Sequence, residues 1–410
     1  MIILLHQFSP YSINLEYTAN DNIVVIAPVF QKIKYENYKK SLPKIIFLED
    51  YTLVEILKVI FDLSKENNIE KVYTLNEDII EWAALISEFF NNKESELVKS
   101  LLYTNKYYMR SFLNGIVNQP YFRLLKSVND LDLFWENTKV DKAIIKPTVG
   151  MSSEKIFIIN RGDDEIKNEF YKYNMKFLIE EYLEIDYMLT ADGYSIGKDI
   201  ILFSSHEYER PLLNVLKGNS KEYIVRTNPN YSKNIKLMEK LLLESKKVLE
   251  CFINDKSVNG FHYEWFYDFD KDKFYLCEVA KRFGGASIPF LFNYAFNINL
   301  MENFWNSFIK DGEYDEKKIK KNSVINPQKI AGCYMRGLKD GKKIVKGLNI
   351  EDFKWTKNTW IFIKENQETI NNNNISDVIS LSEIVSETEE DFESQIKELN
   401  RLTEKIEYEK

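Results

Sequence analysis

The sequence predicts a fold that is α/β in its N-terminal part and α+β in the rest, divided into several domains. Residues 1 to about 100 alternate short apolar runs with helical patterns, the order typical of a parallel α/β sheet. Farther along, residues 142–159 and 260–280 each place two apolar runs around a polar loop, which indicates antiparallel hairpins. The length of 410 residues also exceeds the usual size of one hydrophobic core.

The composition excludes several classes of function. The chain has 63 acidic and 55 basic residues, a net charge of −8, and no cluster of lysine and arginine long enough to follow a nucleic-acid backbone. We therefore expect no nucleic-acid partner, and any polyphosphate ligand should be small. Neither a run of about 18 apolar residues nor a signal-peptide pattern occurs, so we expect a soluble cytoplasmic protein without membrane contact.

The cysteines and histidines carry no metal-site spacing. Cys251, Cys277 and Cys333 are scattered and lack a CxxC pair, which indicates neither a disulfide framework nor a zinc site and fits a reducing compartment. The three histidines are also spread along the chain, so the sequence argues against histidine-based metal chemistry.

In the first hundred residues, four apolar runs predict strands and two amphipathic patterns predict helices. The expected strands are residues 2–5, 23–26, 44–47 and 71–74, and the expected helices are residues 53–65 and 78–90. No GxGxxG follows the first strand, so we do not expect a dinucleotide site there. We interpret this region as a scaffold or as one wall of a substrate site.

Two basic residues stand on the next predicted helix, which runs from about Lys106 to Leu113 between capping residues and Gly115. Lys106 and Arg110 are one turn apart on one face of it. Taken alone, such a pair is usually a solvated basic edge.

A loop with phosphate-binding character follows Lys146, where the first strand of the 142–159 hairpin ends. Gly150, Ser152 and Ser153 offer backbone amides and hydroxyl groups that can surround a phosphate. The GK[ST] ending of a Walker A loop is missing, and a plain hairpin loop is the alternative.

Residues 177–183 are apolar at first and then acidic. Their backbone, with Glu180 or Glu181, could present a hydrogen-bonding edge to adenine, and Glu184 or Asp186 could lie near a ribose.

The hairpin at residues 260–285 carries the most specific signal. Its first strand alternates strictly, with His262, Glu264, Phe266 and Asp268 on one face. If the loop is centred on Lys271, Glu264 lies directly opposite Glu278. Two facing carboxylates repel each other unless a cation lies between them, and Mg²⁺ takes such ligands together with phosphate oxygens.

The residues after this hairpin also suit a phosphate. Arg282 follows the second carboxylate by four positions, and Gly284 and Gly285 leave backbone amides accessible to an anion. The alternative is an amphipathic hairpin with a charged outer face.

The helical patterns at residues 234–252 and 290–309 are expected to pack in the core. The last region predicts strands at 330–335 and 359–364 and a helix at 387–406, with Arg336 a weak candidate for facing the site.

The order of these features resembles the ATP-grasp superfamily, in the carboxylate–amine ligase type to which L-amino acid ligases belong. The carrying segments are NKYYMR with Lys106, KPTVGMSS from Lys146, IEEYLE from Ile179, HYE ending at Glu264, and EVAKRFGG from Glu278. The resemblance covers about residues 100–310. It implies an N-terminal pre-ATP-grasp α/β domain (1–100), a small subdomain with the glycine-containing phosphate loop (101–178), a central subdomain with the metal site (179–312) and a small C-terminal domain (313–410).

The resemblance also implies a role for each site residue. It assigns Lys106 and Lys146 to the phosphates and adenine region, and Arg282 to the transferred phosphoryl group, with Lys146 and Arg282 as the catalytic residues. The nucleotide would further contact Gly150, Ser152, Ser153, Glu180, Glu181, Tyr182, Leu183 and Asp186, with Glu184 as an alternative to Asp186 at the ribose. Glu264 and Glu278 would hold one or two Mg²⁺ ions, for which Mn²⁺ is an alternative.

Two departures from the family pattern stand out. ATP-grasp proteins commonly have asparagine two residues after the second metal-binding glutamate, and Ala280 occupies that place here. Lys281 next to Arg282 could add compensating charge. Ile185 stands where a glycine usually follows the hinge, which leaves the ribose assignment open.

The function that the resemblance implies is an ATP-dependent ligase that joins a small carboxylate to an amine through an acyl phosphate, with release of ADP and phosphate. The alternatives are an ATP-grasp enzyme of another type, such as a carboxylase component or a ligase for a carrier-protein-bound substrate, and an ATP-binding protein without turnover. A homodimer is also an open alternative.

Overall fold

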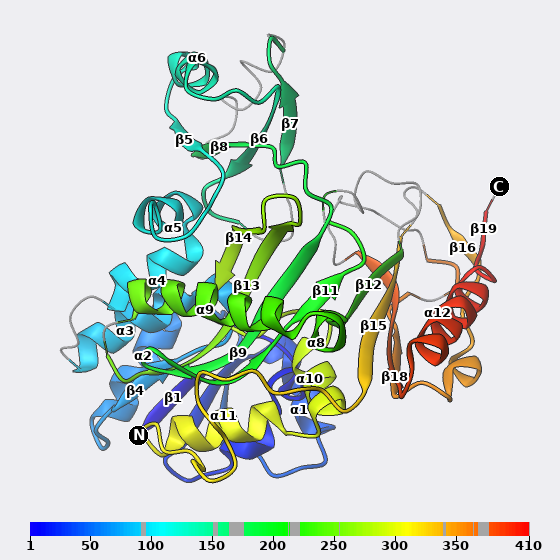
Figure 1. Cartoon of the computed structure of the whole chain (residues 1–410). Coiled ribbons are helices and arrows are strands. Elements are labelled where there is room, and N and C mark those ends of the chain that lie inside the picture. Colours follow the sequence, from blue (N-terminus) through cyan, green and yellow to red (C-terminus); the bar gives the residue numbers. More distant parts are fainter. Residues whose placement is uncertain are drawn as a thin grey trace.

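The computed structural model describes residues 1–91, 96–150, 155–163, 176–211, 213, 222–253, 255–338, 342–363, 365–367 and 377–409. Within them, the strands form four sheets, and helices are interspersed along the whole chain (Figure 1). The mixed α/β and α+β class predicted from the sequence is confirmed.

The N-terminal sheet is parallel, with the strand order β3-β2-β1-β4. Its strands are β1 (Ile2–Leu5), β2 (Ile23–Pro28), β3 (Lys44–Leu48) and β4 (Lys71–Tyr73), accompanied by helices α1 (Lys32–Glu36), α2 (Leu53–Ser64) and α3 (Ile80–Asn91). Every residue of β1 and β2 is buried, as expected for central strands of a parallel sheet. A short 3₁₀ helix, η4 (Glu77–Ile79), follows the carboxyl end of β4.

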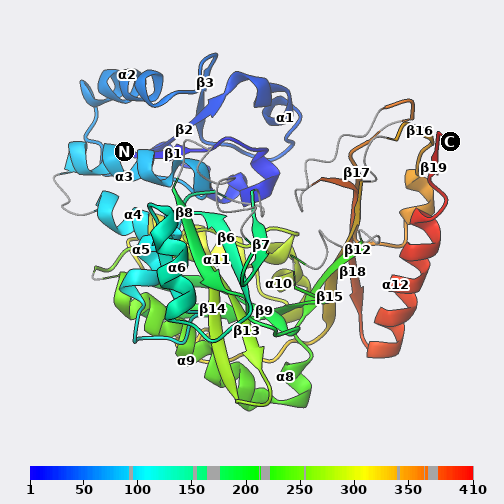
Figure 2. The ribbon, with the colours of Figure 1, turned by 90° about the horizontal axis from the view of Figure 1, so that it is seen from above.

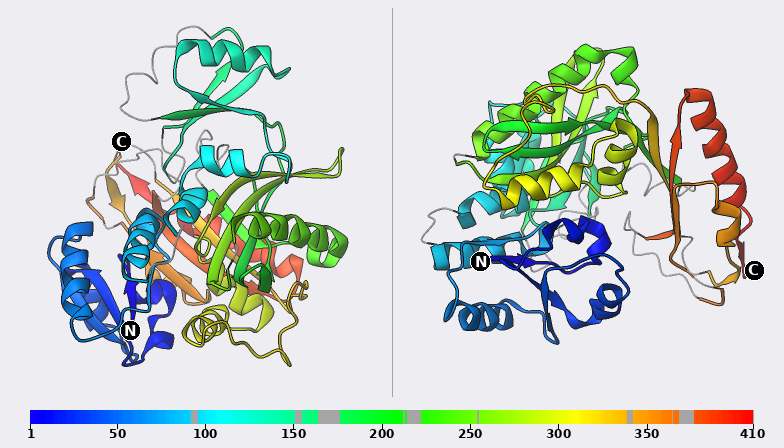
Figure 3. Two further views of the ribbon diagram at one scale, coloured as in Figure 1. Left: turned by 90° about the vertical axis from the view of Figure 1, so that its left-hand side faces the viewer. Right: turned by 90° about the horizontal axis from the view of Figure 1, so that it is seen from below.

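The small sheet is antiparallel and has the order β5-β8-β6-β7. It comprises β5 (Phe122–Leu125), β6 (Lys142–Pro147), β7 (Phe157–Asn160) and β8 (Phe177–Glu181), preceded by α4 (Glu96–Thr104) and α5 (Lys106–Phe112), with α6 (Val128–Glu136) between β5 and β6. Leu131 and Phe134 of α6 pack against its inner strand residues to form a separate core. Figure 3 (left) shows this sheet standing clear of the rest of the molecule.

The predicted start of α5 at Lys106 is confirmed because the chain builds a cap there. The side chain of Asn105 accepts hydrogen bonds from the backbone amides of Tyr107 and Tyr108, which leaves Lys106 on the first turn.

The central sheet has nine strands in the order β14-β13-β9-β11-β12-β15-β18-β17, with β10 paired to β9. The strands are β9 (Met188–Ile196), β10 (Asp199–Ser204), β11 (His206–Tyr208), β12 (Glu222–Thr227), β13 (Val258–Asp268), β14 (Lys273–Ala280), β15 (Ile330–Gly337), β17 (Asn358–Ile361) and β18 (Val378–Ser386). Among its helices are α8 (Asn230–Lys233), α9 (Ile235–Phe252), α10 (Ile288–Phe296) and α11 (Leu300–Ile309). α9 packs on β9 and β10, α10 on β12 and β15, and α11 on β13.

The last hundred residues contribute three strands to this same sheet. Helix α12 (Glu389–Thr403) packs on β15 and β18, and β16 (Ile344–Lys346) pairs with β19 (Glu407–Tyr408). The predicted boundary between residues 312 and 313 therefore divides the chain but not the sheet, and the four-part domain division stays a prediction. Seen from above, the N-terminal sheet and α12 lie at different ends of the molecule (Figure 2).

Candidate active site

A cavity of about 990 Å³ lies where the N-terminal sheet, the small sheet and the central sheet approach one another. Glu77 of η4, Lys106 of α5, Lys146 of β6 and Glu278 of β14 all line it. Pockets for small ligands usually measure about 300–1,000 Å³, so this one lies at the upper end of that range.

The predicted nucleotide and metal residues gather around this one cavity. Those that line it are Lys106, Lys146, Gly150, Glu180, Glu181, Tyr182, Leu183, Glu184, Asp186, Glu264, Glu278 and Arg282. Ser152 and Ser153 lie outside the described residues. These residues lie between positions 106 and 282 of the sequence, so tertiary folding, and not local sequence, brings them together.

The β13–β14 hairpin pairs Glu264 with Glu278, as predicted from the sequence. Trp265 pairs with Leu276, because a β-bulge leaves Cys277 as an extra residue on β14. The predicted centring on Lys271 is therefore wrong between the bulge and the turn, where every pairing is displaced by one residue. The bulge leaves the two carboxylates on the same face.

The alternation along β13 separates core from cavity. Tyr263 and Trp265 are fully buried in the main core, whereas Glu264 and Phe266 from the other face line the cavity. The apolar face anchors the strand, and the opposite face is left to present functional groups.

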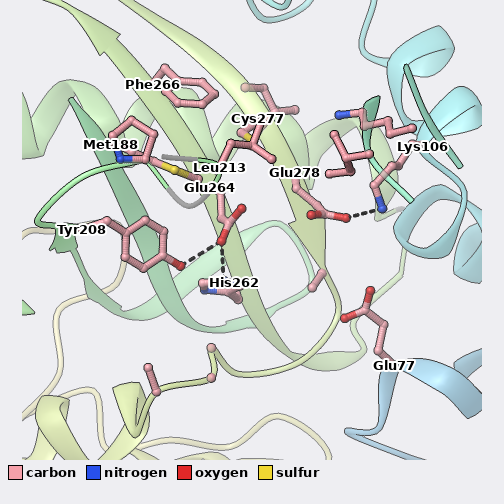
Figure 4. A pocket seen from close by; sticks show the side chains of 18 of the residues that line it. Glu77, Lys106, Met188, Tyr208, Leu213, His262, Glu264, Phe266, Cys277 and Glu278 are labelled. Atoms are coloured by element: carbon pink, nitrogen blue, oxygen red, sulfur yellow. Dashed lines mark hydrogen bonds and ion pairs between the residues drawn. The ribbon is translucent and has the colours of Figure 1, made fainter. Parts of the chain in front are cut away.

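Each facing carboxylate has polar partners (Figure 4). Tyr208 donates a hydrogen bond to Glu264 Oε1 at 2.8 Å, and Lys106 Nζ lies 2.6 Å from Glu278 Oε1. Burial alone would raise the pKa of Glu278, but the charge of Lys106 and its hydrogen bond outweigh burial and lower it. Glu278 is therefore ionised, and Lys106 offsets its repulsion of Glu264.

Lys106 also holds the start of the glycine-containing loop. Its Nζ donates to the carbonyl oxygen of Gly150 at 2.7 Å, and the backbone amide of Lys106 donates to Thr148 at 2.7 Å. Gly150 has φ +143°, a conformation that favours glycine. The loop and α5 thus meet at the cavity.

Lys146 is held by a buried carboxylate. Its Nζ lies 2.8 Å from Glu180 Oε2, while Arg110 binds both oxygens of Glu180, with Nε 2.7 Å from Oε1 and Nη2 3.1 Å from Oε2. Burial would raise the pKa of Glu180, but Arg110 and Lys146 lower it to about 2. Arg110 is only 1% exposed, so the interpretation of its face as a solvated edge is wrong.

Arg110 also joins the small sheet to the β13–β14 hairpin. Its Nη1 and Nη2 donate to the carbonyl oxygens of Leu276 and Cys277 at 2.7 and 2.9 Å. These residues immediately precede Glu278. One buried guanidinium therefore fixes Glu180 on β8 relative to the strand that carries Glu278.

Glu77 is a site residue that the sequence analysis missed. Its Oε2 lies 2.6 Å from Arg282 Nε, and Arg282 Nη1 donates to the carbonyl oxygen of Phe283 at 2.9 Å. Glu77 follows the carboxyl end of β4, the edge at which parallel sheets commonly place ligand-binding groups. That position after the predicted strand 71–74 was the signal that could have identified it.

The segment after β8 forms another wall of the cavity. Glu181 accepts a hydrogen bond from the backbone amide of Tyr121 at 3.0 Å, and Glu184 forms an ion pair with Lys142 at 2.9 Å. Asp186 is exposed in the same lining, so both ribose candidates remain. Among the described residues, no hydrogen bond uses the backbone of Leu183, which leaves that backbone edge open to a ligand.

A buried group of two histidines and one aspartate lies against the β13–β14 hairpin. Asp192 is fully buried, and its Oδ1 and Oδ2 lie 2.6 Å from His262 Nδ1 and 3.3 Å from His206 Nδ1. His262 Nε2 lies 3.5 Å from Glu264 Oε1. Burial would lower the pKa of His262, but Asp192 and Glu264 raise it to about 9.

Comparison with solved structures identifies the architecture. An L-amino acid ligase from Bacillus licheniformis superimposes with a TM-score of 0.76 at 16% identity, covering 100% of this chain and 98% of that one. N5-carboxyaminoimidazole ribonucleotide synthetase from Thermus thermophilus gives a TM-score of 0.69 at 12% identity, covering 100% of both chains. The chain has the ATP-grasp fold.

A third ATP-grasp structure contains ligands. It is the biotin carboxylase domain dimer of a Hydrogenobacter thermophilus 2-oxoglutarate carboxylase in complex with MgADP, ADP and bicarbonate, with a TM-score of 0.68 at 11% identity over 100% of this chain and 90% of that one. Neither a scan against protein-family models nor a search of curated protein sequences finds a match. None of the helices in the described segments combines the length and apolarity needed to cross a bilayer.

The departures from the ATP-grasp pattern are also visible in the structure. Ala280 lines the cavity directly opposite His262 and offers no side-chain ligand. Lys281 is not among the residues that line the cavity, and burial lowers its pKa, an effect that the charge of Glu96 opposes, so nothing here supports the expected compensating charge. Arg336 pairs with Glu222, and its neighbour Met335 reaches the cavity in its place.

Proposed function

We propose that this protein is an ATP-dependent carboxylate–amine ligase, which forms an amide bond through an acyl phosphate and releases ADP and phosphate. The observation that carries the proposal is the pair of facing carboxylates, Glu264 and Glu278, in one cavity with Lys106, Lys146 and Arg282. Carboxylates for a metal and cations for a triphosphate are the groups that phosphoryl transfer requires. The L-amino acid ligase with the same fold favours this reaction among those of ATP-grasp proteins.

The nucleotide assignments follow the cavity walls. Lys106 and Lys146 bind the phosphates, and the loop that begins at Gly150 covers them. The adenine contacts the segment from Glu180 to Leu183, where the open backbone edge of Leu183 supports the assignment. Arg110 and Lys146 both bind the carboxylate of Glu180. We therefore propose that Glu180 positions Lys146 and also forms part of the adenine wall.

The donor set fits a hard divalent cation. Glu264 and Glu278 provide carboxylate oxygens on one face of the hairpin, and Mg²⁺ prefers such ligands with water and phosphate oxygens completing its shell. Mn²⁺ is the alternative metal. When bound, the metal would neutralise phosphate charge and polarise the group that is transferred.

The chemical steps need no protein nucleophile. A carboxylate oxygen of the substrate attacks the γ-phosphorus of ATP, the bond to the β–γ bridging oxygen breaks, and ADP leaves. A neutral amine then attacks the acyl carbon, the bond to phosphate breaks, and the amine loses a proton. Lys146 and Arg282 hold negative charge during these steps, and the cavity keeps the two substrates together.

Two other reactions stay as alternatives. The carboxylase neighbour was crystallised with bicarbonate, which makes a bicarbonate-dependent reaction the second candidate. A carrier-protein-bound substrate is a variant of the ligase itself. We also propose a reducing compartment such as the cytoplasm, because the three cysteines are free thiols, and we keep homodimer formation as a prediction.

The test is Mg²⁺-dependent ATP consumption with pools of amino acids and amines, in which ADP and AMP are separated by chromatography. We expect ADP and phosphate only when a carboxylate and an amine are both present. ADP formed with bicarbonate and no amine would favour the carboxylase alternative, and AMP with pyrophosphate would rule out the acyl-phosphate reaction.

A further inference from the structure

Four residues form a rectangle on the cavity face of the β13–β14 hairpin. His262 pairs with Ala280, and Glu264 pairs with Glu278 in the next cavity-facing row. All four line the cavity. The corner at Ala280 is where ATP-grasp proteins commonly have a metal-binding asparagine, so the group directly across from the missing ligand is the imidazole of His262.

The orientation of that imidazole is fixed by buried groups. Asp192 Oδ1 lies 2.6 Å from His262 Nδ1, and the other oxygen of Asp192 is within reach of His206 Nδ1 and bonded to Thr190. Because Asp192 is fully buried, its charge is costly unless these partners are present. The Asp192 carboxylate is thus buried, and of the two histidines it contacts, His262 is the closer one.

The backbone also makes room for this pair. A Cβ placed on Gly284 would lie 2.8 Å from both Asp192 Oδ1 and His262 Nδ1, a distance at which something must shift. Any residue with a side chain at 284 would therefore displace the aspartate or the ring. The site therefore depends on a close approach of the Gly284 backbone to the Asp192 carboxylate and the His262 imidazole.

With Nδ1 turned to Asp192, the other ring nitrogen is directed at the carboxylate of Glu264. His262 Nε2 lies 3.5 Å from Glu264 Oε1, and the His262 side chain is 8% exposed at the cavity (Figure 4). A carboxylate that accepts Nδ1–H and leaves the Nε2 lone pair towards a metal is the arrangement that proteins commonly use to orient a histidine ligand.

We propose that His262 Nε2 is the third protein ligand of the divalent ion held by Glu264 and Glu278, and that it replaces the asparagine oxygen absent at Ala280. This inference rests on the metal site of the proposed function and adds a ligand to it. A nitrogen ligand favours Mn²⁺ and later transition metals over Mg²⁺, so the site should discriminate less strongly for magnesium than an all-oxygen site does.

Glu278 has another partner in this arrangement, because Lys106 Nζ lies 2.6 Å from its Oε1. Among the described residues, no group of three or more histidine, cysteine or acidic side chains is placed so that it could hold a metal ion. Coordination by His262, Glu264 and Glu278 together would therefore require Glu278 to turn away from Lys106.

The test measures metal binding and requires no turnover. The full-length protein is titrated with Mn²⁺ in the presence of ADP, followed by electron paramagnetic resonance, and the nitrogen coupling of bound Mn²⁺ is read by electron spin-echo modulation. The chain has only 3 histidines, so ¹⁵N-histidine labelling assigns any coupling to imidazole. We expect a histidine coupling in the wild type and its loss in His262→Gln, together with about tenfold weaker Mn²⁺ binding.

A matched variant replaces the missing oxygen. In His262→Gln/Ala280→Asn we expect metal binding to return without a nitrogen signal, and the preference for Mn²⁺ over Mg²⁺ to fall. If His262→Gln does not fold, the labelled wild type alone decides, because the coupling is read on the unaltered protein.

Bound Mn²⁺ without histidine coupling in the wild type, or unchanged affinity in His262→Gln, would overturn the proposal. Failure of the metal site itself is distinguished by Glu264→Gln and Glu278→Gln. If these two variants bind Mn²⁺ as tightly as the wild type does, both the histidine ligand and the metal site of the proposed function are wrong.

Discussion

The candidate active site contains three ion pairs that a ligand must rearrange or use. Lys106 contacts Glu278, Lys146 contacts Glu180, and Arg282 contacts Glu77. The paired cations lower the pKa of Glu278 and of Glu180, although burial alone would raise it. If the proposed nucleotide and metal bind here, these residues would exchange partners, and Lys106 would leave Glu278 for a phosphate oxygen.

Replacement of Glu278 by glutamine should abolish turnover and preserve the fold. Glutamine keeps the volume but removes the negative charge that the metal requires, so kcat should fall roughly 100-fold or more. Steady-state ATP turnover measures the loss, and circular dichroism checks the fold. A variant that is folded and turns over normally would contradict the metal assignment.

Glu77→Gln should reduce kcat more than it changes the KM for ATP. Its carboxylate holds Arg282, which we assign to the transferred phosphoryl group and not to the adenine or the ribose, so a misplaced Arg282 should affect phosphoryl transfer most, by about tenfold or more. Asp78→Asn is the matched control, because Asp78 is an exposed neighbour that lines the same cavity. Equal effects of the two substitutions would argue against this positioning role.

Arg110→Met should destabilise the protein in a pH-dependent manner. The folded-state pKa of Glu180, about 2, is below its ordinary value of 4.5, so the stabilisation by Arg110 and Lys146 is fully present above pH 4.5 and is lost as pH falls towards 2. Removal of one partner of a buried pair costs about 3–5 kcal/mol. Urea unfolding from pH 7 to pH 3 should show a difference that shrinks in acid.

The control is Arg401→Met, because Arg401 forms an exposed pair with Glu398 on α12. Surface pairs contribute about 0–1 kcal/mol, so this variant should unfold much like the wild type at each pH. A pH-independent loss in Arg110→Met would mean that Arg110 acts by packing alone.

The β13–β14 hairpin shows which features of a secondary-structure element could be predicted from the sequence and which could not. The strict alternation from Phe261 to Asp268 determined which face is buried, and the two facing glutamates were therefore predictable. The bulge at Cys277 was not, because an extra residue in one strand leaves the alternation of the other unchanged. Arg110 donates hydrogen bonds to the carbonyl oxygens of Leu276 and of the bulge residue Cys277, and no sequence pattern links these residues to α5.

The loop between β14 and α10 contains one glycine that leaves no space for a side chain and a second glycine that does. Gly284→Ala should destabilise the fold and weaken metal binding, because its Cβ would lie 2.8 Å from Asp192 and His262. Gly285→Ala is the matched control, since nothing lies within 4 Å of a Cβ there. Thermal unfolding and Mn²⁺ affinity of the two variants should differ clearly, and equal behaviour would show that the close approach is not required.

At the scale of the whole molecule, three sheets contribute to one cavity. The four strands of the N-terminal sheet and helices α2 and α3 were predicted with small errors at their ends, because buried parallel strands read as continuous apolar runs, whereas the short helix α1 was not predicted. The region was interpreted as a scaffold or one wall of a substrate site, but the part played by Glu77 was not predicted, because Glu77 meets Arg282 only when β4 and β14 are brought together. The same holds for the continuous central sheet, in which β12 and β15 are far apart in sequence.

The transfer of oxygen from the substrate carboxylate to phosphate is the direct test of the proposed acyl phosphate. A carboxylate substrate labelled with ¹⁸O is turned over with ATP and its amine partner, and the phosphate is analysed by mass spectrometry. We expect one ¹⁸O atom in the released inorganic phosphate, because the carboxylate oxygen that attacks the γ-phosphorus leaves with it. Label in AMP, or amide formation with unlabelled phosphate, would rule out an acyl phosphate.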